Sequence, residues 1–138
     1  MGCTNFKVAV RSARYRGGLV KILGCIHDLM FSTRVRDAAT SLGHECEIVR
    51  RATDVPAKLD GADLLIVDLM VAGGGALDAV GAGLKAGVVV AAYGEHVRAD
   101  VLDEARQAGA DMVLTRSEFV YRLPVILGGE PRRPAPSG

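Results

Sequence analysis

The sequence predicts an α/β fold in which helices cover both faces of one parallel sheet. Five short apolar runs alternate with helical patterns between residues 20 and 127, and glycines stand at many of the turns between them. The chain has 138 residues, of which 49% are hydrophobic, and this suits one domain with a substantial core. Strands that alternate with helices form right-handed βαβ units, which build a parallel sheet.

The first half of the domain should contain three strands and two helices. The strands are expected at 19–26, 46–49 and 63–67, where apolar residues gather. Apolar residues from 35 to 42 recur at the i, i+3, i+4, i+7 spacing of one helix face. Ser32 or Thr33 is the expected N-cap of this helix, and Gly43 is expected just after its end. A weak helix is expected at 55–59.

The second half should contain three helices and two strands. The helices are expected at 76–84, 98–108 and 118–127, the last interrupted by Pro124, and the strands at 87–92 and 112–115. Five strands and this chain length fit the flavodoxin-like, doubly wound sheet with strand order 2-1-3-4-5 in a three-layer α/β/α arrangement. In this order the first and third strands are neighbours. His27, Asp28 and Asp68 should therefore meet at the carboxyl edge of the sheet.

The charge distribution divides the chain into a domain and two tails. The net charge of +1 consists of +4 in residues 1–19, −4 in 20–127 and +1 in 128–138. Residues 1–19 are expected to be a basic, disordered tail, and 128–138 a disordered tail with three prolines and two arginines. The mildly acidic domain at 20–127 argues against a nucleic-acid-binding face.

The three cysteines, Cys3, Cys25 and Cys46, form no Cys-x-x-Cys pair, which excludes a zinc ribbon and a thioredoxin-type redox site. The longest apolar stretch, 86–92, is too short to cross a bilayer. No signal-peptide core follows Met1. These features predict a cytoplasmic protein without membrane contact.

Asp68 is the most informative single residue. It ends the apolar run at 63–67 and is followed within a few residues by Gly73, Gly74 and Gly75. Ligands of open α/β sheets bind at the carboxyl ends of the strands, so this carboxylate is a candidate functional group. The alternative is an aspartate that only caps the turn after its strand.

Four segments around this aspartate resemble the receiver domain of response regulators. These segments are Asp68 to Gly73, Ala91 to Gly94, Ala108 to Asp111 and Leu114 to Phe119. Their order and spacing follow the receiver pattern over about residues 20–127. The resemblance implies that Asp68 is the phosphoacceptor and that a magnesium ion assists phosphotransfer.

Several positions depart from that resemblance. Ile26 and His27 stand where receivers carry two metal-binding acids, and only Asp28 follows. Ala91 stands where the resemblance implies a serine or threonine hydroxyl, and Arg116 where it implies a lysine. The departures predict a degenerate, or pseudo-, receiver: a non-enzymatic signalling domain without a cofactor that acts through contact with another protein.

Other hypotheses remain open from the residues alone. Asp68 could still accept a phosphoryl group in an atypical phosphorelay, and magnesium is expected only in that case. His27, Asp28 and Asp68 are weak candidates for a metal site, because imidazole and carboxylate bind several divalent ions. The glycines at 73–75 could bind a small ligand or anion at the sheet's switch point, although a simple turn is the commoner role of such residues.

A protein partner, or a second copy in a homodimer, would contact the face that receivers commonly use. The resemblance places the fourth helix, fifth strand and fifth helix of the fold on this face. The predicted interaction residues are Tyr93, Arg98, Val113, Arg116, Phe119, Val120 and Tyr121. An exposed cluster at 119–121 would be a suitable anchor, and burial of these residues under the last helix is the alternative.

Overall fold

In the computed structural model, which describes residues 20–71 and 73–128, five parallel strands form one sheet. Their bounds are β1 Lys21–Cys25, β2 Glu45–Val49, β3 Leu64–Asp68, β4 Val89–Gly94 and β5 Met112–Thr115. The strand order is β2-β1-β3-β4-β5, and every neighbouring pair is parallel. The predicted flavodoxin-like, doubly wound fold is therefore confirmed. The predicted tail at 1–19 lies outside the described residues, as does the predicted tail at 128–138 except for Gly128.

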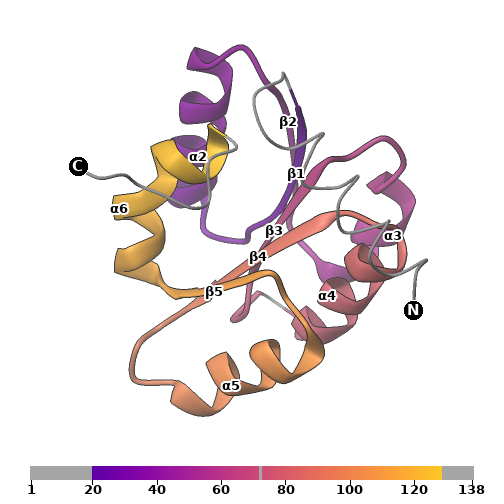
Figure 1. Cartoon of the computed structure of the whole chain (residues 1–138), viewed down its shortest axis with the longest axis vertical. Helices are drawn as coiled ribbons and strands as arrows, with labels where there is room; N and C mark the ends of the chain where they lie inside the picture. Colours follow the sequence, from indigo (N-terminus) through magenta and orange to yellow (C-terminus); the bar gives the residue numbers. More distant parts are fainter. Residues whose placement is uncertain (1–19, 72, 129–138) are drawn as a thin grey trace, which may run out of the picture.

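Helices cover both faces of the sheet (Figure 1). The α-helices are α2 Leu29–Ser41, α3 Val55–Lys58, α4 Ala76–Lys85, α5 Ala99–Ala108 and α6 Arg116–Leu127, and a 3-10 turn, η1, spans Ala52–Asp54. Helices α2 and α6 pack on one face, and α3, α4 and α5 on the other. None of the helices in the described part is long and apolar enough to span a bilayer.

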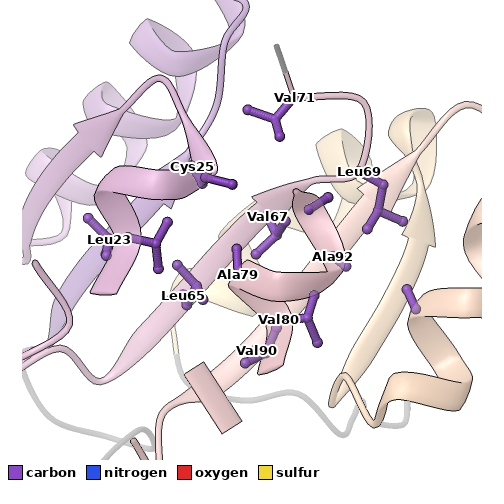
Figure 2. Close-up of a cluster of buried hydrophobic side chains, with 14 of the residues drawn as sticks. Leu23, Cys25, Leu65, Val67, Leu69, Val71, Ala79, Val80, Val90 and Ala92 are labelled. Carbon is purple, nitrogen blue, oxygen red and sulfur yellow. The ribbon is translucent and has the colours of Figure 1, made fainter. Parts of the chain in front are cut away.

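The face under α3, α4 and α5 is filled by aliphatic side chains (Figure 2). Leu65 and Val67 of β3 and Val90 of β4 are fully buried there. They pack against Ala79 and Val80 of α4. Small residues on α4 allow the helix to lie close to the sheet, and this contact holds the central strand β3 in place.

The face under α2 and α6 contains three packed aromatic rings. The Tyr93 ring centroid lies 4.8 Å from that of Phe31 and 4.9 Å from that of Phe119, and Phe31 and Phe119 are 5.8 Å apart. Tyr93 and Phe119 are at most 1% exposed. Aromatic pairs at these distances add to the stabilisation that burial supplies.

The start of α2 differs from the prediction. Asp28, not Ser32 or Thr33, is the N-cap, and its carboxylate accepts the Phe31 N–H at 3.1 Å. The two hydroxyls lie inside the helix and donate to the Leu29 carbonyl. Asp28, Ser32 and Thr33 can all cap a helix, and the earliest of the three is the cap, so the helix begins at Leu29.

Helix α6 begins earlier than predicted and continues past its proline. Thr115 and Glu118 form a reciprocal capping box, so the helix starts at Arg116. Pro124 lies within the helix, which ends at Leu127. The prediction that Pro124 interrupts α6 was wrong, because the lost hydrogen bond is outweighed by the burial of the stripe that includes Leu123 and Ile126.

His44 connects two ends of the domain. Its Nδ1 accepts the Val20 N–H at 3.2 Å, so its Nε2 donates to the Leu127 carbonyl at 2.6 Å. This histidine therefore joins the start of β1 to the end of α6.

The two described cysteines are unpaired thiols, and burial raises the pKa of the Cys25 thiol to about 11.

Candidate functional site

A polar pocket of about 270 Å³ opens at the carboxyl edge of the sheet, beside the ends of β1, β3 and β4. Its lining residues are His27, Asp28, Asp68, Met70, Tyr93, Gly94, Glu95 and Arg116. The three side chains that the sequence brought to this edge, His27, Asp28 and Asp68, all line this pocket. It lies at the switch point of the sheet, where the chain leaves β1 and β3 in different directions.

Asp68 lies at the inner wall of the pocket and is only 6% exposed. Its Oδ1 accepts the Met70 N–H at 2.9 Å, as in an aspartate that caps a turn. Burial raises the pKa of Asp68 above its usual range, although the Met70 N–H and the charge of Arg116 act in the opposite direction. The carboxylate thus combines the predicted capping role with a place in the pocket.

Arg116 and Asp28 form an ion pair across the mouth of the pocket. The Arg116 Nη2 donates to Asp28 Oδ2 at 2.6 Å, and the Arg116 Cζ lies 4.8 Å from the centre of the Phe31 ring. The hydrogen bond from Arg116 is the main cause that lowers the pKa of Asp28. A lysine has neither the planar group nor the reach to make both contacts in the same way.

The register between β3 and β4 corrects the role given to Ala91. Ala91 pairs with Ile66 and is fully buried, two residues away from the level of Asp68. Tyr93 is the residue that pairs with Asp68. The side chain beside Asp68 therefore does carry a hydroxyl, but it is the phenol of a tyrosine in place of a small serine or threonine.

The Tyr93 hydroxyl is buried without a hydrogen-bond partner among the described residues. Burial, and next the negative charge of Asp68, raise the pKa of this phenol far above its usual value. The phenol and the Asp68 carboxylate are near enough to affect one another's pKa, but the pair does not meet the geometric criteria of a hydrogen bond. Sequence reasoning missed Tyr93 as a pocket residue, and also Glu95 and Met70.

The pocket does not fit the divalent cation that the receiver resemblance implies. Ile26 is buried in the core beneath α2 and α6, so its side chain faces away from the edge of the sheet. Asp28 is already paired with Arg116. Within residues 20–71 and 73–128, no group of three or more His, Cys, Asp or Glu side chains is arranged to hold a metal ion. The hypothesis that His27, Asp28 and Asp68 bind a metal ion therefore has no support from the arrangement of these side chains.

The glycine loop before α4 makes a second, smaller hollow of about 240 Å³. Gly73, Gly74 and Gly75 all have φ between 75° and 85°, which explains why glycine stands at each position. Asp78 and Glu104 line this hollow beside the loop. Their negative charges oppose an anion, so the loop is better explained as a tight turn that starts α4.

The predicted interaction face is only partly at the surface. Tyr93 and Phe119 are buried in the aromatic cluster, and these two predictions are corrected. Tyr121 is 87% exposed, and Val120 is half-buried. Both residues line an apolar groove of about 720 Å³ between the β4–α5 loop and α6, together with Val97 and Arg116. Arg98 and Val113 are half-buried outside the lining of this groove.

Comparisons with known proteins agree on the fold. No family model matches the sequence, and no curated protein matches it significantly. NtrX from Brucella abortus shares 17% identity at a TM-score of 0.69, over 79% of this chain and 26% of NtrX. The phosphorylated cyanobacterial phytochrome response regulator RcpA shares 17% identity at a TM-score of 0.66, over 81% of this chain and 91% of RcpA.

The receiver domain of the Francisella response regulator 1452 shares 14% identity at a TM-score of 0.62, over 78% of this chain and 96% of that domain. The chain spans about a quarter of NtrX (26%) and nearly all of the isolated receiver domain (96%). The chain therefore has the fold of the receiver domains of response regulators.

Proposed function

We propose that this chain is a degenerate receiver domain that signals through contact with a partner protein and does not carry out efficient phosphotransfer. The observation that supports this most is the ion pair between Arg116 and Asp28. Asp28 is the one acid left near the end of β1, since Ile26 and His27 stand at the positions where the resemblance implies acids. Arg116 neutralises it with a fixed guanidinium.

Phosphoryl transfer depends on a cation that neutralises the incoming group, and in receivers this cation is a hard divalent metal ion. A guanidinium bound to Asp28 occupies the carboxylate that such an ion would need. Tyr93 adds bulk beside Asp68, where the resemblance implies a small hydroxyl side chain. In this proposal the domain is non-enzymatic and its signal leaves through a surface, and a cytoplasmic location stays a prediction.

An atypical phosphorelay is the second candidate, and one observation favours it. Asp68 lines an open pocket whose wall also contains the guanidinium of Arg116. Arg116 could neutralise part of a phosphoryl group on Asp68 if it left Asp28. In that case the protein would accept phosphate from a donor without the full set of metal-binding acids.

Incubation with acetyl phosphate and magnesium, followed by intact-mass measurement, separates the two candidates. The proposal expects no phosphoryl adduct on the wild-type protein, while an active receiver domain treated in parallel gains one. An adduct that is lost in Asp68→Asn and retained in Asp60→Asn would overturn the proposal. Asp60 is an exposed loop residue, so Asp60→Asn changes the charge equally without touching the pocket.

A further inference from the structure

The polar pocket carries an excess of negative charge. Three carboxylates, those of Asp28, Asp68 and Glu95, line it with one guanidinium, that of Arg116. Arg116 is paired with Asp28. Neither Asp68 nor Glu95 has an ion-pair partner among residues 20–71 and 73–128. The pocket therefore attracts a positive group more strongly than an anion.

A buried oxygen without a partner belongs to a side chain that lines the same pocket. The Tyr93 hydroxyl is shielded from solvent and has no hydrogen-bond partner in the described part of the chain, while the Tyr93 side chain lines the pocket. A buried polar atom without a partner costs free energy that a suitable donor would recover. An N–H donor that enters beside Asp68 would supply this missing hydrogen bond.

An apolar groove adjoins the polar pocket and shares two residues with it. Glu95 and Arg116 line both, so the two spaces lie on either side of this pair. The groove presents Val97, which is 69% exposed, and Tyr121, which is 87% exposed. A ligand that fills both spaces must carry a polar cationic group next to apolar groups.

We propose that the pocket receives an arginine side chain from a partner protein, whose neighbouring apolar residues lie in the groove along α6. The guanidinium would donate to Asp68 and Glu95 and to the Tyr93 oxygen, because it has five N–H donors in a planar fork. This inference rests on the proposed function and names the chemistry of the partner. It differs from metal binding, for which this part of the chain has no ligand cluster.

The test is a titration of the isotope-labelled protein with the peptide acetyl-Gly-Leu-Arg-Leu-Gly-amide, followed by NMR. Binding should shift the backbone amides of Gly94, Glu95 and Tyr121, with a dissociation constant of roughly 1 mM, which is weak because a short peptide makes few contacts. The matched peptide with citrulline in place of arginine has the same shape without the charge. It should bind at least about tenfold more weakly, which is a difference of about 1.4 kcal/mol.

Variants locate the binding on the protein. Glu95→Gln and Tyr93→Phe should each lower the affinity of the protein for the arginine peptide severalfold. Glu45→Gln removes an exposed carboxylate from the opposite edge of the sheet and should leave the affinity unchanged. Equal binding of the arginine and citrulline peptides, or no binding at 10 mM (roughly ten times the expected constant), would overturn the inference. Shifts of the same amides by magnesium chloride alone would overturn it in favour of a metal site.

The acetyl phosphate experiment keeps this inference distinct from the proposed function. If the arginine peptide does not bind and acetyl phosphate gives no phosphoryl adduct, the inference of an arginine partner is wrong, but the proposal of a degenerate receiver stands. An adduct on Asp68 would overturn the proposed function, and with it the inference that depends on it.

Discussion

Two glycines in α4 should respond in opposite ways to the same substitution. A Cβ added at Gly81 meets no atom within 4 Å, whereas one added at Gly83 lies 2.8 Å from Leu65 Cδ2 and 2.9 Å from Val90 Cγ2. Both neighbours are fully buried, and Val90 is β-branched, so its side chain has little freedom to move. The contact tests how α4 lies on β3, the strand that ends in Asp68.

The intrinsic helix preference of alanine over glycine is worth about 1 kcal/mol at an open position. Gly81→Ala should therefore raise the free energy of unfolding by about 1 kcal/mol, or roughly 4 °C in melting temperature. Gly83→Ala receives the same gain but overpacks the core, which costs about 1–3 kcal/mol. The net result at Gly83 should be a loss of about 1 kcal/mol.

Urea unfolding followed by circular dichroism measures both variants on the same scale. Each variant is the control for the other, because both add one methyl group to one helix and the intrinsic preference cancels in their difference. Equal stabilisation of the two variants would refute the reasoning, since Leu65 and Val90 would then have room to move. A stability loss in Gly81→Ala would contradict the open surroundings of that position.

Three further substitutions test the site and the corrected interaction face. Tyr93→Phe should raise the free energy of unfolding by about 1 kcal/mol, because it removes a buried hydroxyl without a partner; a loss measured by urea unfolding would indicate a hydrogen bond to that hydroxyl. Asp68→Asn should stabilise the protein at pH 7, since burial raises the pKa of Asp68 and the folded state therefore disfavours the ionised form. The stabilisation by Asp68→Asn should become smaller as the pH falls towards the usual aspartate pKa of 3.8. Urea unfolding that shows the same stabilisation at pH 7 and at the lower pH would contradict this explanation. Phe119→Ala should lower the free energy of unfolding by about 3–5 kcal/mol, and Tyr121→Ser by less than about 0.5 kcal/mol. Similar losses for the two variants in thermal unfolding would indicate that the Phe119 side chain is exposed.

The sequence predicted the fold well because its apolar runs are short, regular and separated by turn residues. All five strands were found, since strands of a covered parallel sheet are rich in apolar residues, as in β3, where residues 64–67 are all apolar. Helix ends were less certain. Asp28, Ser32 and Thr33 can all cap a helix, and only the packing of α2 against the sheet selects Asp28.

The site was harder to predict because it depends on the register between strands. The strand predicted at 87–92 is observed at Val89–Gly94. A shift of two residues keeps every side chain on its original face, so the alternation of a strand cannot reveal it. The resemblance had put Ala91 at the position of the hydroxyl residue, while Tyr93 is the residue that pairs with Asp68 in the structure.

Arg116 connects the pocket, the groove and the first turn of α2. Its partner Asp28 also accepts the Phe31 N–H, so the ion pair holds the carboxylate that caps α2. In Arg116→Gln the cap should loosen, and the Phe31 amide should exchange its hydrogen faster in NMR experiments. Arg106→Gln is the matched control, because Arg106 pairs with Asp103 on α5. Unchanged exchange at Phe31 would mean that Asp28 caps the helix without help from Arg116.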